Sequence, residues 1–319
     1  MYKKFKEVIL FGTKPQVPFN ILTKDLLDID EGDNLTKFRD ELLTANLVII
    51  TGWSHKTWIK IIAEVKKKNP GLKVCLSVDN NLRKTFRQRI GKYYFKFFIS
   101  SIADFYFVAG RSSFDLLKFF DVPDEKIFFG YYGSYSKLYY PQGLNDRHGF
   151  VFVGQKIERK GIDTLRQAYK LYKSELNGRQ CLKVVGGSER GSLDDLVEHG
   201  YSETGFLQPQ DTAKVLSQSK TLILPSRVEH WGTIVCEAAA CGCSLLLSDK
   251  IGSRLDMLLP GVNGFSFHVG DIRGLANSMK KFDQLPNFWH LTSSEASISL
   301  ASAFDERAYC AAVVSMLES

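Results

Sequence analysis

The sequence predicts an α/β protein with two domains, each a parallel β-sheet covered by helices. The chain has 319 residues, which is enough to bury two separate hydrophobic cores. Short β-rich apolar runs alternate with amphipathic helical stretches along most of the chain, and this pattern is typical of parallel α/β sheets. The alternation breaks in a polar segment at 142–149, so we expect one domain over 1–145 and another over 146–304.

In the first domain, the expected strands are apolar runs, several of which end in glycine. They lie at 8–12, 47–52, 74–78 and 105–109. Helices are expected at 58–68, where apolar residues share one side and lysines line the other, and at 112–120. The last helix, about 305–319, is expected to pack back on this first domain.

In the second domain, the same alternation predicts a longer series of elements. Strands are expected at 150–154, 182–186, 204–207, 221–225 and 244–248, and helices at 162–174, 192–199, 211–219 and 233–240. The helix at 162–174 carries Ile162, Leu165, Tyr169 and Tyr172 at near-helical spacing. One face of this helix should therefore be buried.

The net charge of +7 is concentrated in the first domain. Residues 1–149 hold 24 Lys and Arg against 16 Asp and Glu, a balance of +8, and the remaining residues hold 18 against 19, a balance of −1. The first domain is therefore expected to contact an anionic partner, either a membrane surface, a phosphorylated acceptor or a nucleic acid.

The apolar runs also bear on location and on metal binding. None approaches the roughly 18 apolar residues of a membrane-spanning helix, and 8–12 is too short for the core of a secretion signal. We therefore expect a cytoplasmic protein, with contact at the inner face of the membrane left open. The six cysteines form no C-x-x-C pair, so buried free thiols are expected rather than disulfides or a zinc site.

The segment at 223–249 holds the residues best suited to chemistry. A strand ends there, a short loop carries Glu229, and a helix begins near Gly232 and Thr233. Ligands of open α/β sheets bind at the carboxyl ends of strands, and the first amides of a helix bind phosphate. The carboxylates of Glu229 and Glu237 can accept hydrogen bonds from sugar or ribose hydroxyls.

The same segment resembles a known family. Glu229 and Glu237, with seven residues between them, look like the E-x7-E motif of the family-4 retaining GT-B glycosyltransferases, also called glycosyl transferases group 1. Further matches are Leu224-Pro225-Ser226, Glu229-His230-Trp231-Gly232, Glu237-Ala238-Ala239-Ala240-Cys241-Gly242 and Pro260-Gly261-Val262-Asn263-Gly264. The resemblance implies a GT-B fold, in which two Rossmann-like domains face a central cleft.

A second matching segment, at 150–161, resembles the family's entry into the donor domain. Lys160 stands where the family has a lysine that binds the donor diphosphate. The family usually has arginine after the glycine of this segment, whereas this chain has Gln155. Arg159 is the preferred source of a second positive charge, with Lys156 as the alternative.

The resemblance implies roles for named residues. The catalytic residues would be Glu229, Lys160 and His55, the last as an acceptor-side histidine. The donor would contact Gly154, Arg159, Lys160, Gly186, Gly187, Phe206, Leu207, Glu229, His230, Trp231, Gly232, Thr233 and Glu237. His230 is left open between packing and touching the donor. No metal and no cofactor are expected, and Asp28-Ile29-Asp30 is interpreted as a solvated loop rather than a metal motif.

The function implied is retaining transfer of a hexose-type sugar from a UDP- or GDP-linked donor to a glycan or lipid-linked acceptor. Surface polysaccharide or lipopolysaccharide synthesis is the expected setting. A second hypothesis, a non-catalytic nucleotide-sugar-binding partner of another transferase, stays open. The basic, aromatic segment 82–102 is interpreted as either a membrane-surface helix or a core-facing helix with a basic edge. Nucleic-acid binding is not expected, because no binding motif accompanies the charge.

Overall fold

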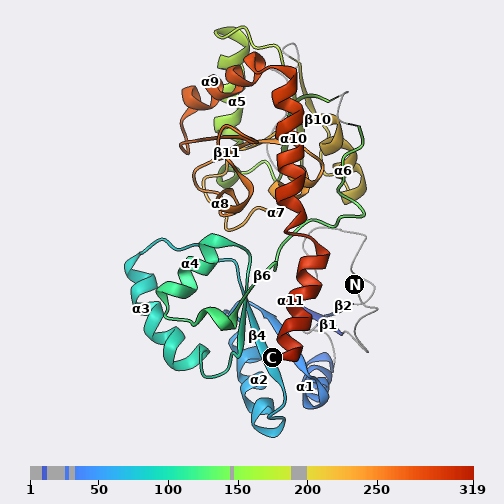
Figure 1. Cartoon of the computed structure of the whole chain (residues 1–319). Helices are drawn as coiled ribbons and strands as arrows, with labels where there is room; N and C mark the ends of the chain where they lie inside the picture. The colour runs from blue at the N-terminus through green and yellow to red at the C-terminus, as the bar shows by residue number, and fades with distance from the viewer. Residues whose placement is uncertain (1–8, 13–25, 29–32, 144–146, 188–199) are drawn as a thin grey trace. The chain divides into compact units, whose positions relative to one another are not determined.

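The computed structural model describes residues 9–12, 26–28, 33–143, 147–187 and 200–319. The chain packs as two compact units (Figure 1). Unit 1 comprises Met1–Tyr131 and Arg307–Ser319, and unit 2 comprises Tyr132–Glu306. The division by packing therefore falls before the polar segment at 142–149, and the chain returns to unit 1 at its end.

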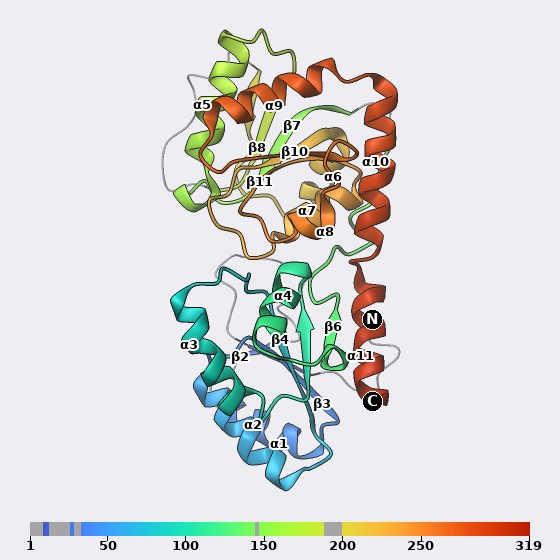
Figure 2. The same ribbon diagram turned by 60° about the vertical axis from the view of Figure 1, so that its left-hand side comes forward.

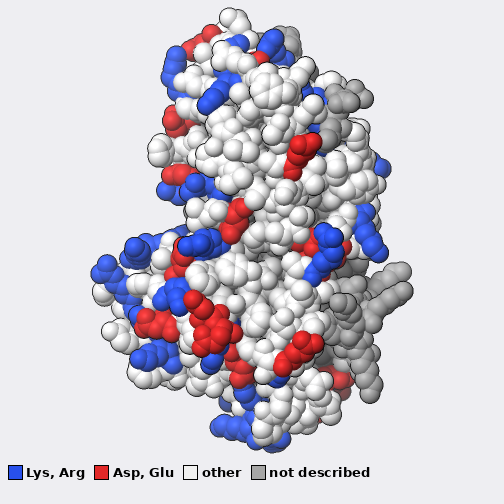
Figure 3. Space-filling model, in the orientation of Figure 1, with Lys and Arg blue, Asp and Glu red and all other residues white. Residues whose placement is uncertain are grey.

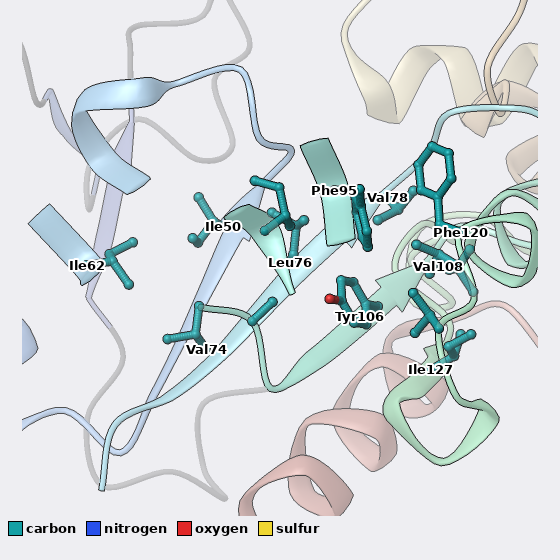
Figure 4. Packing of buried hydrophobic residues seen from close by; sticks show 14 of the residues in the cluster. Ile50, Ile62, Val74, Leu76, Val78, Phe95, Tyr106, Val108, Phe120 and Ile127 are labelled. Atoms are coloured by element: carbon teal, nitrogen blue, oxygen red, sulfur yellow. The ribbon is translucent and has the colours of Figure 1, made fainter. Parts of the chain in front are cut away.

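Unit 1 contains a parallel sheet of four strands in the order β3-β4-β5-β6. The strands are β3 (Leu47–Thr51), β4 (Lys73–Val78), β5 (Phe105–Val108) and β6 (Ile127–Phe129). A separate parallel pair is formed by β1 (Leu10–Gly12) and β2 (Leu26–Asp28). The main core lies between the larger sheet and its helices, where Phe95, Tyr106 and Phe120 pack together (Figure 4).

The helices of unit 1 cover this sheet. They are α1 (Asn34–Thr44), α2 (Lys56–Lys68), α3 (Phe86–Tyr94), α4 (Arg111–Phe119) and α11 (Glu306–Glu318), and a π-helical turn, η2 (Phe95–Ile99), continues α3. The apolar side of α2 is buried, as its periodicity predicts. From the other end of the chain, α11 packs Ala312, Val313 and Met316 against Cys75 and Phe107 of the sheet.

Unit 2 contains a parallel sheet of six strands in the order β12-β11-β10-β7-β8-β9. The strands are β7 (His148–Val153), β8 (Leu182–Val185), β9 (Tyr201–Glu203), β10 (Ser219–Leu224), β11 (Ser244–Ser248) and β12 (Gly264–Phe267). Numbered within the unit, this order is 3-2-1-4-5-6 read from β9, which is the order of the doubly wound dinucleotide-binding fold. Figure 2 shows helices on both faces of this sheet.

The described helices of unit 2 are α5 (Ile162–Ser174), α6 (Pro209–Gln218), α7 (Thr233–Ala240), α8 (Arg254–Met257), α9 (Ile272–Gln284) and α10 (Asn287–Ser302). The first three lie where helices are predicted, and the last three are not predicted from the sequence. The prediction of a strand at 204–207 is wrong, because pairing with β8 ends at Glu203 and the backbone that follows is irregular. The helix expected at 192–199 lies outside the described residues.

All six cysteines are free thiols. Four are buried, but Cys181 is exposed and Cys310 is partly exposed, so the expectation of buried thiols is wrong for these two. Within the part of the chain that the structure describes, no helix is both long and apolar enough to cross a membrane.

A buried polar network joins α5 to α9 in unit 2. The Tyr172 hydroxyl lies 2.9 Å from a carboxylate oxygen of Asp283, whose side chain is fully buried. The same hydroxyl accepts a hydrogen bond from the Gln180 amide at 2.8 Å, and the Arg179 amide donates to Asp283 at 3.0 Å. Because these groups are withdrawn from water, each depends on its protein partners.

Replacing the hydroxyl of this network should destabilise unit 2. We expect Tyr172→Phe to lower the free energy of unfolding by about 1–3 kcal/mol, because it leaves buried partners short of a hydrogen bond. Tyr135→Phe is the control, since Tyr135 is half exposed. Urea denaturation followed by circular dichroism measures both variants, and equal losses in the two would refute the role assigned to the network.

Candidate donor-sugar site in unit 2

The sheet of unit 2 changes direction between β7 and β10. From β7 the chain proceeds to β8 and β9 on one side, and from β10 it proceeds to β11 and β12 on the other. In open α/β sheets, ligands bind beyond the carboxyl ends of the two strands at such a switch point. A ligand-binding site is therefore expected at the loops that follow β7 and β10.

These two loops are held in close contact. The loop after β7 forms a short 3₁₀ turn, η4 (Glu158–Lys160), and ends at Gly161, whose φ is +70°. A Cβ atom at Gly161 would overlap the carbonyl oxygen of Pro225 in the loop after β10, so only glycine fits there. Between the two loops, the Arg227 amide donates a hydrogen bond to the Arg159 carbonyl at 2.8 Å. The guanidinium of Arg227 forms ion pairs with Glu158 and Asp163.

An ion pair between Lys160 and Glu229 lies where the loops meet. The Lys160 ammonium contacts the Oε2 atom of Glu229, and the two side chains are only 15% and 13% exposed. The Arg159 guanidinium lies 3.7 Å from the same oxygen, and the Ser226 hydroxyl lies 3.5 Å from it. One carboxylate thus faces two cations.

The backbone holds Glu229 in place. Its amide donates to the Lys250 carbonyl at 3.2 Å, and its carbonyl accepts from the Gly252 amide at 3.1 Å. These bonds form a short parallel bridge to Ile251, in the segment after β11. The carboxylate of Glu229 is therefore positioned by three strand ends rather than by a free loop.

Next to this ion pair in the sequence, α7 begins at Thr233. Gly232 precedes it with a φ of +90° and, as a glycine, has no side chain of its own to cap the helix. The first amides of a helix are donors that suit an anion. Trp231 is buried and packs against Phe304, with ring centroids 5.4 Å apart, so it anchors the loop between β10 and α7. His230 is exposed.

Glu237 lies one turn into α7, with a partner that the sequence does not reveal. The Tyr139 hydroxyl forms a hydrogen bond with its carboxyl group, and burial raises the pKa of Glu237 to about 7. Burial, together with the neighbouring Glu237 carboxylate, also raises the pKa of Tyr139 above its ordinary value. Nearly one hundred residues separate Tyr139 from Glu237 in the chain. In the sequence, Tyr139 stands out only because the strand pattern breaks there, so the hydrogen bond could not be predicted.

The donor contacts expected at 186–187 and 206–207 lie just after β8 and β9. Gly186 lies so close to Gly154 that a Cβ at Gly186 would overlap the Gly154 carbonyl oxygen, and the Gly186 amide donates to the Gly205 carbonyl at 2.7 Å. Phe206 and Gly187 are exposed, and Leu207 is partly buried. These backbone contacts bring the ends of β7, β8 and β9 together.

Lys156, the alternative to Arg159, takes part in a different ion pair. Its ammonium pairs with Glu203 at the end of β9, and Glu203 also accepts a hydrogen bond from the Tyr201 hydroxyl. The second cation beside Glu229 is therefore Arg159.

His55 belongs to unit 1, where it precedes α2 and stacks on Trp58 with ring centroids 4.3 Å apart. Its side chain is exposed, and its catalytic role stays a prediction. Of the Asp28-Ile29-Asp30 motif, only Asp28 lies within the described residues. Within the described ranges, no group of three or more His, Cys, Asp or Glu side chains could hold a metal ion.

Part of unit 2 is similar to known proteins. Residues 142–293 match the family model described as "Glycosyl transferases group 1". The O-antigen chain mannosyltransferase B of Escherichia coli is 31% identical over 106 residues, which cover 31% of this chain and 28% of that protein. The lipopolysaccharide 1,6-galactosyltransferase of E. coli K12 is 28% identical over 135 residues, covering 41% of this chain and 36% of that protein. The matched stretch thus spans about a third of the length of these curated relatives.

Solved structures extend the likeness to most of the chain. Anabaena Alr3699/HepE in complex with UDP matches with a TM-score of 0.67 and 16% identity, over 89% of this chain and 80% of that one. The sucrose-phosphate synthase of Thermosynechococcus elongatus matches with a TM-score of 0.63 and 18% identity, over 86% and 75%. Together with the two parallel sheets, these matches confirm the predicted fold class: the chain has the GT-B fold with two Rossmann-like domains.

Proposed function

We propose that this protein is a retaining glycosyltransferase that moves a hexose-type sugar from a nucleotide diphosphate to an acceptor. The observation that carries the proposal is the meeting of Lys160, Arg159 and Glu229 at the switch point of a doubly wound sheet, beside the start of α7. Cations and helix amides suit a diphosphate, and carboxylates suit hydroxyl groups. A nucleotide diphosphate sugar carries both kinds of group.

The donor diphosphate would lie between Lys160 and the start of α7. On binding, the Lys160 ammonium exchanges Glu229 for a phosphate oxygen, and the amides near Gly232 and Thr233 donate to the same group. Arg159 is 47% exposed and 3.7 Å from Glu229, so it can turn toward the phosphates. These charges stabilise the diphosphate as it leaves, which is the largest electrostatic change in the reaction.

The two glutamates would hold the hydroxyl groups of the donor. Glu229, released from Lys160, accepts hydrogen bonds from the sugar, and Glu237 accepts them from the ribose. Glycines at the ends of β7 and β8 let the nucleoside approach the backbone. Phe206 and Leu207 follow β9, the strand that pairs with β8, and are also proposed to contact the donor. With the donor held in this way, the acceptor approaches the anomeric carbon from the same side that the leaving phosphate occupied. The phosphate oxygen then takes the proton of the acceptor, and the configuration is retained.

The acceptor would be a glycan or lipid-linked saccharide of a surface polysaccharide or lipopolysaccharide. The two E. coli relatives, an O-antigen chain mannosyltransferase and a lipopolysaccharide galactosyltransferase, support this class. His55, exposed at the start of α2, is proposed to contact the acceptor. UDP and GDP are the carriers to test first.

Binding of nucleotides should separate the roles of Lys160 and Glu229. We expect Lys160→Ala to weaken binding of the free nucleoside diphosphate about 10- to 100-fold, because a charge-assisted contact is lost. Glu229→Gln should leave that affinity equal or tighter, since Lys160 is released, yet weaken binding of the nucleotide sugar. Isothermal titration calorimetry measures both, with Arg166→Ala on the exposed side of α5 as the control. If Glu229→Gln weakened both ligands equally, the division of roles would be wrong.

The raised pKa of Glu237 predicts a pH-dependent affinity. Both oxygens of its carboxylate can accept hydrogen bonds from the ribose hydroxyls only when the group is deprotonated, so binding opposes protonation. With a pKa of about 7 in the free protein, affinity for a nucleotide sugar should rise as the pH increases through 7 and then level off. A nucleotide sugar is the right probe because its diphosphate diester does not titrate there. Glu237→Gln should flatten the profile, and an unchanged profile in that variant would assign the titration to another group.

Turnover distinguishes a transferase from a non-catalytic binding partner. The native chain should release nucleoside diphosphate from its nucleotide sugar, slowly with water and faster with acceptor. Glu229→Gln and Lys160→Ala should each lower the rate at saturating donor at least 10-fold, because each loses contacts to the reacting group. Release is followed by a coupled assay for nucleoside diphosphate. Tight donor binding with no release under any acceptor tested would favour the binding-partner hypothesis.

A further inference from the structure

An exposed row of large apolar side chains runs along α3 and η2 in unit 1. The exposed aromatic face, as we call it, consists of Phe86, Ile90, Tyr93, Tyr94, Phe97 and Phe98, and these side chains are between 44% and 76% exposed. The first five follow one another at intervals of four, three, one and three residues, which places them on one side of a helix. Contiguous apolar surface of this kind marks an interaction site.

The helix is anchored by its opposite side. Phe95 and Ile99 are buried in the core of unit 1, and the Phe95 ring packs 4.9 Å from Phe120 and 5.7 Å from Trp53 between centroids. The Thr85 hydroxyl caps the start of α3 by accepting from the Gln88 amide at 3.3 Å. The core-facing interpretation of 82–102 is therefore wrong for most of its aromatic residues, because only Phe95 among them is buried and the other five are exposed.

The π-helical turn extends this outward face. In η2, the wider turn keeps Phe97 and Phe98 exposed together between the buried Phe95 and Ile99. A π-helical turn costs backbone hydrogen-bond geometry and recurs at functional positions. In this protein, the π-helical turn adds the Phe98 ring to the exposed aromatic face.

Positive charge surrounds the exposed aromatic face. Residues 82–102 contain six Lys or Arg and no Asp or Glu. Lys92 pairs with Asp121 at 2.7 Å, whereas the others form no salt bridge with any residue of the described ranges. These five are Arg83, Lys84, Arg87, Arg89 and Lys96. Basic side chains gather along the left edge of Figure 3, where α3 lies in Figure 1.

We propose that the exposed aromatic face binds the surface of an anionic lipid bilayer. Aromatic rings on the outer side of a helix fit the boundary between headgroups and acyl chains, and flanking Lys and Arg meet the anionic headgroups. The unpaired basic charge argues for this occupant, since a second copy of the chain would bring the same positive charge to the contact. The helix is already folded and anchored, so binding needs no donor nucleotide and stands apart from the proposed reaction.

Vesicle binding by the full chain tests this proposal. The chain is sedimented with vesicles of phosphatidylcholine alone and of phosphatidylcholine mixed with phosphatidylglycerol, without nucleotide. We expect binding to the mixed vesicles that weakens as salt is added. Arg87→Gln with Arg89→Gln should lower the partition coefficient about 25-fold, at about fivefold for each charge. Phe97→Ser should also weaken binding, and Phe97→Trp should show blue-shifted fluorescence on the mixed vesicles.

Matched variants elsewhere on the chain keep the test specific. Phe288→Ser removes a side chain of similar exposure from α10, and Arg166→Gln with Lys170→Gln removes two exposed charges from α5. These controls should bind vesicles as the native chain does, and circular dichroism checks the fold of every variant. Absent binding, equal binding to neutral vesicles, or equal loss in the controls would overturn the proposal. So would a native dimer that Phe97→Ser converts to a monomer, because the face would then join two copies.

Discussion

The ion pair between Lys160 and Glu229 is the interaction on which the site in unit 2 depends. It joins the loop after β7 to the loop after β10, at the point where the sheet changes direction. Both side chains are largely withdrawn from water, so each compensates for the desolvation of the other, and removing one leaves an uncompensated charge. Gly161 and the ion pairs of Arg227 with Glu158 and Asp163 bring the two loops close enough for this contact.

The same pair explains how a site for a charged ligand can exist without the ligand. In the free protein, Glu229 partly neutralises Lys160 and Arg159, so no cation is left buried and unpaired. A nucleotide sugar would supply phosphate for the cations and hydroxyl groups for the carboxylate, and so replace both partners. Because the loops are already fixed by backbone hydrogen bonds, little further ordering is required of them.

Much of this arrangement can be predicted from the sequence. The buried strands of unit 2 are apolar runs, and α5 and α7 begin and end at the predicted residues because their periodicity is clear. The helix α10 is harder, since it buries Ser293 and Ser297 and carries no apolar stripe. The hydrogen bond between Tyr139 and Glu237 depends on tertiary packing, which no local spacing reveals. The segment 82–102 is readable as amphipathic, but only the anchoring of Phe95 and Ile99 shows which side faces outward.

A crystal structure of the chain with a bound nucleoside diphosphate would show whether the ion pair is the diphosphate site. Phosphate oxygens should lie within hydrogen-bond distance of the Lys160 ammonium and of the first amides of α7. The contact between Lys160 and Glu229 should be opened, with Glu229 still held to Ile251 by its backbone. A diphosphate bound elsewhere, with Lys160 still paired to Glu229, would show that the ion pair is not the diphosphate site.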